Sequence, residues 1–198
     1  MKSLTLTIVC TLMLSLLSAC DSLQRTAARV IPVLELADPD LAADPVICDP
    51  AFSGPEPTVD CVIDEISCGT IIEANSSVGS NNWGDDFYRG IYCTPESHDY
   101  DNAPEAVYRL TIPPSMMATV QLDSNCVDLD VAGIMWGDED VCPKLGQLLH
   151  VCEMDTSRGG GTIQMSAVDT PTQYLVAVDG KNGESGNYRL SVSCHRYR

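Results

Sequence analysis

Short runs in which apolar and polar side chains alternate with a period of two constrain the fold of this chain more than any other feature. In residues 105–113, Ala106, Tyr108, Leu110 and Ile112 would all lie on one face of an extended strand. Such alternation is typical of β-strands with one buried face. The same pattern recurs in five further segments, residues 117–123, 127–131, 163–167, 174–178 and 188–194.

Turn-forming residues separate these runs. Prolines 113 and 114, the three glycines at 159–161 and the polar segment 179–186 each end or begin a run. No uninterrupted window of helical periodicity reaches a dozen residues after residue 47. Short strands joined by turns at this spacing predict an all-β, antiparallel β-sandwich.

The first twenty residues resemble the signal peptide and lipobox of a bacterial lipoprotein. Lys2 precedes an uncharged run at 4–17, which is shorter than the roughly 20 apolar residues that a membrane-spanning helix needs. Leu17-Ser18-Ala19-Cys20 then fits the lipobox, so Cys20 would become the acylated N-terminus. The alternative is an ordinary secretory signal. Cleavage after Ala19 would place Leu17 at the −3 position, where a small residue is preferred. Cleavage after residue 28 fits small residues better but lies far from the apolar run, and cleavage after Cys20 would leave no lipid.

This resemblance divides the chain into three parts. Residues 1–19 are predicted to be the lipoprotein signal peptide, and residues 20–47 a lipidated tether in which proline and acidic residues recur. Residues 48–198 are predicted to form the β-sandwich domain, which is long enough for one domain with a real core.

The charge of the chain is strongly acidic. The formal net charge is −17, and removal of residues 1–19, which contain one lysine and no acid, makes it −18. Such a surface repels phosphate backbones and anionic lipid head groups. We therefore expect no nucleic-acid partner, and we expect the N-terminal lipid to make the membrane contact.

The cysteines indicate export. Cys10 and Cys20 belong to the export region, and the other eight form an even set in an exported chain, which is typical of a disulfide framework. No C-x-x-C pair is present and the three histidines are scattered, so zinc ligation is not expected.

Two long segments, residues 75–104 and 137–146, are predicted to be loops. The first is rich in Asn, Gly, Ser and Asp and carries Trp83, Tyr88 and Tyr92, which could line a binding site for a sugar or a peptide. The alternative is that such aromatics belong to the core. For Trp136 we favour this alternative, as a continuation of the strand that contains Val131.

Four segments in order resemble the bacterial pre-peptidase C-terminal domain over residues 66–194. They are residues 105–110, the Asp-Leu-Asp-Val segment 128–131, residues 174–180 and the closing Gly-x-Tyr-x-Leu-x-Val segment 186–192. The resemblance implies a compact, jelly-roll-like sandwich of about 8–9 strands. It also implies a non-catalytic accessory role in secretion or in binding of substrate or matrix, with calcium in the collagen-binding relatives. This chain departs from the family in having no peptidase domain, more cysteines and longer loops.

Fold logic within this resemblance suggests a set of disulfides, although eight cysteines allow 105 connectivities. Cys68 opens the first strand and Cys194 ends the last, so these two would join the ends of the sheet. The remaining pairs would be Cys48–Cys61, which closes a proline-rich loop, then Cys142–Cys152 and Cys93–Cys126.

Asp128 and Asp130 would lie on the same face of one strand, where two carboxylates could share a calcium ion or remain solvated. No other cofactor is expected. The sequence contains no Gly-x-Ser-x-Gly, His-Glu-x-x-His or Walker motif.

The sequence therefore predicts a lipid-anchored protein of the cell envelope, facing the periplasm or the cell exterior. Its domain would bind or organise other molecules, such as an extracellular protein or a glycan, and would not be an enzyme. The alternatives are a carbohydrate-binding surface lipoprotein and a hydrolase with a dispersed site.

Overall fold

The computed structural model describes residues 45–49, 51–52, 62–90, 99–137, 142–144, 150–153 and 159–196. The predicted signal peptide, Cys20 and most of the tether lie outside these residues, as do Cys61, Tyr92 and Cys93. Within the described part of the chain, no helix is long and apolar enough to cross a membrane.

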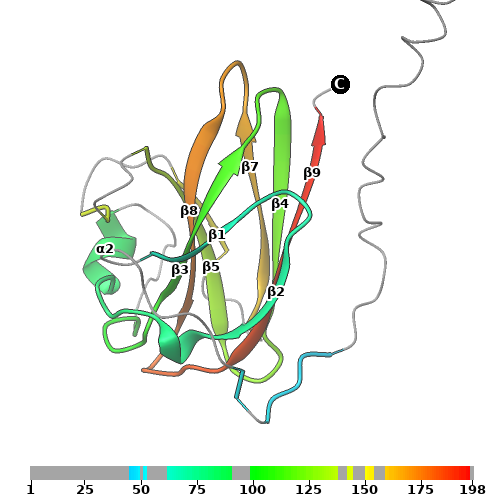
Figure 1. Ribbon diagram of the computed structural model, residues 1–198. Helices are drawn as coiled ribbons and strands as arrows, with labels where there is room; N and C mark the ends of the chain where they lie inside the picture. Colours follow the sequence, from blue (N-terminus) through cyan, green and yellow to red (C-terminus); the bar gives the residue numbers. More distant parts are fainter. Residues whose placement is uncertain are drawn as a thin grey trace, which may run out of the picture. The chain divides into compact units, whose positions relative to one another are not determined.

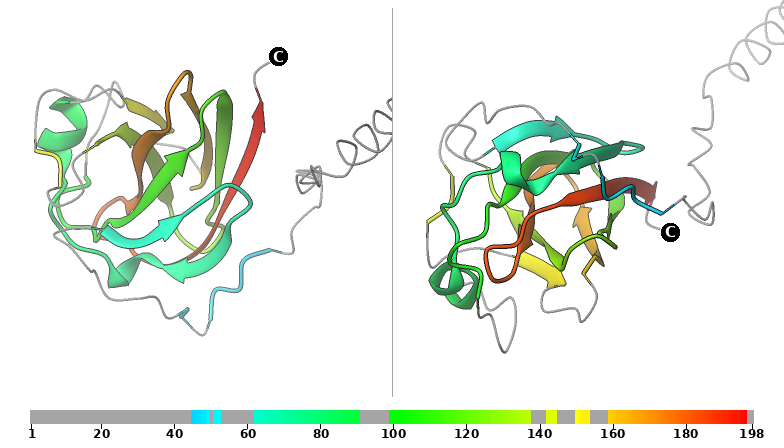
Figure 2. Two further views of the ribbon diagram at one scale, coloured as in Figure 1. Left: turned by 45° about the horizontal axis from the view of Figure 1, so that its top comes forward. Right: turned by 90° about the horizontal axis from the view of Figure 1, so that it is seen from below.

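The described residues form an all-β structure of two sheets with almost no helix (Figures 1 and 2). The five-stranded sheet has the order β1 (Val62–Ile66), β3 (Ala106–Ile112), β8 (Thr172–Gly180), β5 (Leu129–Met135) and β6 (His150–Glu153). The four-stranded sheet has the order β2 (Ile71–Asn75), β9 (Asn187–Arg196), β4 (Met116–Asp123) and β7 (Gly161–Ala167).

The predicted β-sandwich is confirmed, with one difference in strand direction. All pairs are antiparallel except β1 and β3, which run parallel. After β1 a tight turn at residues 67–70 carries the chain into β2 of the other sheet. The long segment that follows β2 then returns the chain to the first sheet, so a crossover and not a hairpin joins β1 to β3, as a parallel pair requires.

The core between the sheets follows the predicted alternation. Ala106, Tyr108, Leu110 and Ile112 of β3 are all buried in it, together with inward-facing residues of β4, β5, β7, β8 and β9. The hydroxyls of Tyr108 and Tyr188 lie 2.5 Å apart across this core and hydrogen-bond to each other. Burial raises the pKa of Tyr108 to about 12, so this pair stays protonated.

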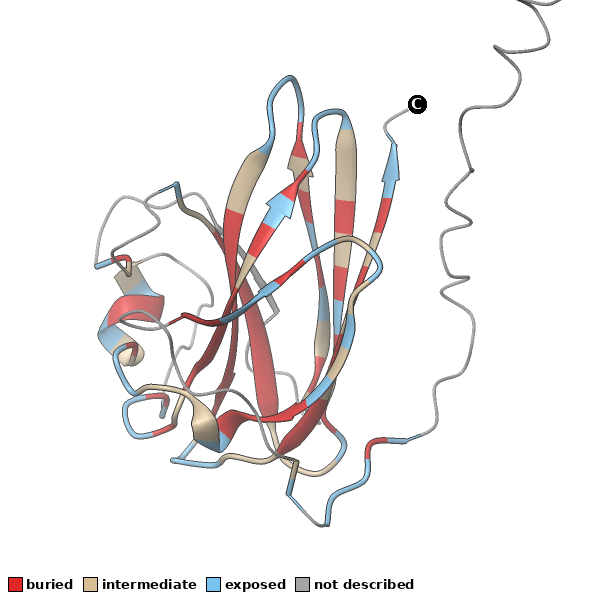
Figure 3. Cartoon of the chain, viewed as in Figure 1, coloured by how far each residue is buried: buried red, intermediate tan, exposed pale blue. Residues whose placement is uncertain are grey.

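Strands β5 and β8 are buried along most of their length, on both faces (Figure 3). The sequence pattern predicted one polar face for residues 127–131, and β5 itself begins only at Leu129. The second face is buried because part of the segment predicted as a long loop packs on it. That segment contains a 3₁₀ turn, η1 (Ser76–Val78), and a six-residue helix, α2 (Asp85–Gly90).

Two disulfides connect distant parts of the domain. Cys68 is bonded to Cys194, as expected from their places before β2 and in β9. Cys48 is bonded to Cys126, which corrects the predicted Cys48–Cys61 and Cys93–Cys126 pairs.

The reason for this correction is that residues 46–52, at the end of the predicted tether and just after it, dock on the domain. Asn125 in the β4–β5 loop accepts a hydrogen bond from the backbone N–H of Val46 at 3.1 Å. Asn187 donates to the carbonyl of Ile47 at 2.8 Å and accepts from the N–H of Phe52. This docking brings Cys48 next to the cysteine that follows Asn125. Cys142 is also disulfide-bonded.

Candidate functional site

Residues 80–90 and 99–104, which we call the cover, form a layer on the outer face of the five-stranded sheet. A second hydrophobic cluster lies between them and the sheet. The cover supplies Trp83, Phe87, Tyr88 and Tyr100, and the sheet supplies Val62, Val107, Ala132, Ile134, Leu175 and Ala177. The five-stranded sheet therefore has apolar contacts on both of its faces.

The aromatic residues of the cover pack on one another. Trp83 and Phe87 stack with ring centroids 4.5 Å apart and an interplanar angle of 8°, and Tyr88 and Tyr100 lie 5.1 Å apart. The structure thus places Trp83 and Tyr88 in the interior, with 2% and 0% exposure, and neither presents an open ring face to a ligand.

Trp136 lies just beyond the end of β5. Its backbone N–H donates to the carbonyl of Gln173 at 3.1 Å, so it extends the strand pairing by one residue. Its side chain is half-buried against the cluster under the cover. This position agrees with the preferred interpretation of Trp136 as a continuation of the strand.

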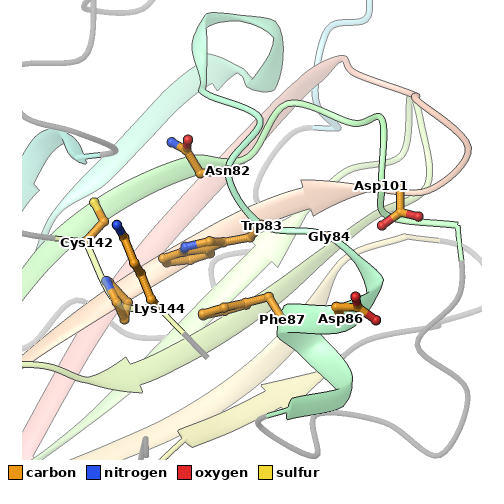
Figure 4. A pocket seen from close by; sticks show the side chains of 9 residues that line it. Asn82, Trp83, Gly84, Asp86, Phe87, Asp101, Cys142 and Lys144 are labelled. Atoms are coloured by element: carbon orange, nitrogen blue, oxygen red, sulfur yellow. The ribbon is translucent and has the colours of Figure 1, made fainter. Parts of the chain in front are cut away.

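A cavity of about 550 Å³ opens at the edge of the cover (Figure 4). In Figure 4 the carboxylates of Asp86 and Asp101 lie at one end and Lys144 at the other, with the rings of Trp83 and Phe87 between them. The lining thus combines charged groups with the edge of the aromatic stack; its residues are Asn82, Trp83, Gly84, Asp86, Phe87, Asp101, Cys142, Pro143 and Lys144.

Three buried acidic residues lie side by side beneath the cover, and we call them the carboxyl row: Glu105, Asp179 and Asp130. Asp130 of β5 is the direct register partner of Asp179 of β8. Ala106 of β3 pairs with Val178, so the preceding residue, Glu105, lies beside Asp179 on its other side. All three acids are at most 1% exposed.

Each acid of the row accepts a hydrogen bond from a different part of the cover. Glu105 Oε1 accepts from the hydroxyl of Ser80 at 2.7 Å and from the N–H of Asn82 at 2.8 Å. The hydroxyl of Tyr88 donates to Asp179 Oδ2 at 2.6 Å. The hydroxyl of Tyr100 donates to Asp130 Oδ2 at 2.5 Å. The row therefore fixes the beginning, the helix and the end of the cover on three adjacent strands.

Burial changes the acidity of two members of the row, Asp179 and Glu105. It raises the pKa of Asp179 well above that of an ordinary aspartate, and the negative charges of Glu105 and Asp130 raise it further, against the hydrogen bond from Tyr88. Burial also raises the pKa of Glu105, although its hydrogen bonds from Ser80 and Asn82 oppose this. The pKa of Tyr88 is raised by burial and by Asp179. Asp179 and Glu105 thus favour bound protons.

The predicted calcium pair is not arranged as expected. Asp130 is fully buried under Tyr100, whereas Asp128 precedes β5 and is half-buried. Among the described residues, no group of three or more His, Cys, Asp or Glu side chains is placed to hold a metal ion. In the carboxyl row, the acids are spread across three strands about 4.8 Å apart and already accept hydrogen bonds. Calcium binding at Asp128 and Asp130 stays a prediction.

Sequence reasoning did not identify the carboxyl row. Glu105 and Asp179 stand at the start and the end of strands, where acids usually mark turns. The usable signal was the cross-strand register, which places both beside Asp130, and that register follows only from the strand order.

Comparisons with known proteins give two similar structures and no family. No protein-family model and no curated protein matches the chain. The first similar structure is a pre-peptidase C-terminal domain of a collagenase from Bacillus anthracis. It has a TM-score of 0.35 and 14% identity over 66% of this chain and 93% of that one. The second is PliG from Aeromonas hydrophila, a periplasmic lysozyme inhibitor of g-type lysozyme. It has a TM-score of 0.34 and 11% identity over 67% of this chain and 99% of that one.

Proposed function

We propose that this protein is a lipid-anchored component of the bacterial cell envelope whose β-sandwich binds or organises other molecules without catalysing a reaction. The observation that carries the proposal is the pair of long-range disulfides, Cys48–Cys126 and Cys68–Cys194. Disulfides of this kind persist in oxidising compartments outside the cytoplasm, and the first of them joins the end of the tether to the domain.

The proposed anchor rests on the resemblance of residues 17–20 to a lipobox. Because the chain is strongly acidic, its surface does not favour anionic lipids, and two or more acyl chains on Cys20 would supply stable anchoring. Mass spectrometry of the N-terminal peptide from the membrane fraction tests this step. We expect an acylated Cys20 and a soluble Cys20→Ala variant, and an unmodified N-terminus at any residue would contradict the anchor.

The burial of the perturbed groups supports binding over catalysis. Catalytic acids and bases have shifted pKa values and must also reach the substrate. Here Tyr88, Asp179, Tyr108 and Tyr188 have raised pKa values, but all are buried under the cover or between the sheets. These groups lie in the interior and do not line the cavity. His195, on the exposed end of β9, is not among the residues that line the cavity.

The cavity at the edge of the cover is the binding site that we propose. Its volume of about 550 Å³ lies within the roughly 300–1,000 Å³ of small-molecule sites. The lining also favours the second candidate function, carbohydrate binding, because Asn82, Asp86, Asp101 and Lys144 can hydrogen-bond to sugar hydroxyls beside an apolar wall. Trp83 would form part of that wall by its edge.

A glycan and matrix-protein array, run with and without calcium, tests the proposal. Asp86 and Lys144 are exposed at the cavity, so Asp86→Ala and Lys144→Ala should fold normally. We expect either substitution to weaken binding about tenfold or more, which corresponds to about 1.4 kcal/mol. Asp169→Ala, at an exposed turn between β7 and β8, is the matched control. Absence of binding to every ligand on the array would contradict the binding function. Binding that neither cavity variant weakens would contradict the cavity as its site.

Calcium titration by calorimetry tests the remaining prediction for Asp128 and Asp130. Calcium bound at this pair would give heat on binding and a rise in Tm at millimolar calcium, both reduced in Asp128→Asn. The absence of heat and of any shift in Tm would remove calcium from the proposal.

A further inference from the structure

We propose that the carboxyl row is a proton-dependent switch for the cover: the cover stays closed on the sheet while Asp179 and Glu105 retain their protons, and it opens as the pH rises and these two acids ionise. The switch involves no ligand, so it stands or falls independently of the proposed binding function.

The first argument is the geometry of the row. Glu105, Asp179 and Asp130 occupy three adjacent strands, and neighbouring strands are about 4.8 Å apart. Like charges directly opposite each other in a sheet are destabilising even when they are exposed. Here the three carboxyl groups are at most 1% exposed, and the low effective dielectric of a protein interior strengthens their repulsion. Full ionisation of the closed row is therefore costly.

The second argument is the position of the cover. Its hydrogen bonds from Ser80, Tyr88 and Tyr100 end on the three acids, and its aromatic rings separate the row from solvent. Water can reach the carboxylates only if the cover moves away. An ionised row is hydrated in the open state and dehydrated in the closed state, so ionisation favours opening.

The sign of the effect follows from linkage. Burial raises the pKa of Asp179 and of Glu105 in the closed state, so the closed state binds protons at a higher pH than a hydrated, open state does. Raising the pH through this range removes protons that only the closed state retains, and the equilibrium shifts toward the open state.

Other ionisable groups around the row modify this equilibrium and do not reverse it. The ammonium group of Lys181 lies 5.9 Å from the ring centroid of Tyr100. Asp128 lies two residues before Asp130, and its pKa is raised by burial and by the negative charge of Asp130. The groups that interact with the row or its tyrosine partners are Tyr88 and Asp85 of α2, Tyr100, Asp128 of the β4–β5 loop and Lys181 of the β8–β9 turn. Glu184 of the same turn interacts with Asp128. Lys181 is the one cation among these groups, whereas the row contains three acids. One positive charge therefore does not neutralise a fully ionised row.

The chain contains its own reporter for the cover. Of its two tryptophans, Trp83 lies within the cover and is buried, and Trp136 is half-buried outside it. In a Trp136→Phe background, the fluorescence of Trp83 alone reports the cover. We expect a red shift of its emission, and stronger quenching by acrylamide, as the pH is raised from 5 to 10. Backbone amides of β4 and β9 should stay protected from hydrogen exchange over this range, which separates opening of the cover from global unfolding.

Two variants give the decisive comparison in this background. Asp179→Asn keeps the shape of the side chain and cannot ionise, so we expect the transition to move up by at least one pH unit or to disappear, with the cover closed. Asp169→Asn removes an exposed carboxylate of the same type and should keep the parent transition.

Three results would overturn the switch. They are a flat Trp83 signal from pH 5 to 10, the same transition in Asp179→Asn as in the parent, and a cover that is open at every pH in Asp179→Asn although β4 and β9 remain folded. If Asp179→Asn does not fold, Glu105→Gln provides the same comparison one strand away, and an unchanged transition in that variant would equally contradict the proposal.

Discussion

The two faces of the five-stranded sheet are buried in different ways. Toward the other sheet, β3, β5 and β8 present a continuous apolar surface, and the buried polar pair there, Tyr108 and Tyr188, is uncharged. Toward the cover, the same strands present a smaller apolar cluster and, at one end, the carboxyl row.

This difference means that the inter-sheet core determines the stability of the domain, whereas the cover determines how part of it responds to pH. The inter-sheet core depends on hydrophobic burial, which is insensitive to pH and holds the whole domain together. The cover depends partly on hydrogen bonds to buried acids, whose contribution changes with their protonation. We therefore expect perturbations of the inter-sheet core to act globally and perturbations of the cover to act locally.

The largest effect should come from the disulfide that ties the inter-sheet core. Cys68 and Cys194 are 126 residues apart in the sequence, and in the chain-entropy model a loop of this length contributes on the order of 4–5 kcal/mol. We expect Cys68→Ala/Cys194→Ala to lower the free energy of unfolding by about this amount in a urea titration. A loss below about 1 kcal/mol would show that the bridge does not constrain the unfolded chain.

Truncation of one buried side chain on each face tests the comparison directly. Leu110 lies in the inter-sheet core and Phe87 in the cover, and both are buried. Removal of such side chains costs about 2–5 kcal/mol. By hydrogen exchange, Leu110→Ala should reduce protection throughout both sheets. Phe87→Ala should reduce it mainly in residues 83–90. Equal loss of protection in β4 for both variants would show that the cover and the core unfold as one unit.

The pH dependence of global stability should come from the cover side. A carboxyl whose pKa is raised by folding contributes its stabilisation fully below its unfolded pKa, and this is lost as the pH rises through the folded value. Since the pKa values of Asp179 and Glu105 are raised, we expect the free energy of unfolding to be greater at pH 5 than at pH 8. A tenfold difference in proton affinity between the folded and unfolded states corresponds to about 1.4 kcal/mol.

The acidic surface acts in the same direction, because protonation also reduces its repulsion. Asp179→Asn separates the two contributions. Urea titrations should show a smaller difference between pH 5 and pH 8 in this variant than in the parent protein, and an unchanged difference would assign the effect to the surface.

The smallest effect should come from an exposed ion pair on the remaining sheet face. Arg189 of β9 and Glu73 of β2 are 2.6 Å apart, with the glutamate side chain 44% exposed. Exposed pairs contribute about 0.2–1 kcal/mol. We expect Glu73→Gln to lower Tm slightly and to have less effect at high salt. A loss as large as that of Leu110→Ala would mean that this face is structurally more important than its exposure indicates.

The inter-sheet core could be predicted from sequence because strands with a period of two place every second residue on one face. Tyr108, Leu110 and Ile112 are buried as the pattern requires. Residue 130 broke the same rule: its polar side chain suggested a solvent-facing surface, and a distant segment buries it. Alternation reports which face a residue occupies, but it does not report whether another segment covers that face.

The cover itself lay beyond prediction for a related reason. Its helix has six residues, too few for a helical period to be recognised, and its attachment depends on pairs such as Tyr88 with Asp179, which are 91 residues apart. The same limit applied to Cys48 and Cys126, 78 residues apart, whose pairing depends on where the chain docks. Cys68 and Cys194 were predictable because each lies close to the end of a strand whose position the pattern already indicated.

The docking of residues 45–52 also determines how the domain would carry mechanical load. The bond from Cys48 reaches Cys126, which lies between β4 of one sheet and β5 of the other. Tension applied through the preceding chain therefore enters a connection shared by both sheets, and it does not first peel away β1, the edge strand that comes next in the sequence. Reduction of this one bond would transfer the same tension to β1, so the disulfide sets the point at which the domain resists being pulled.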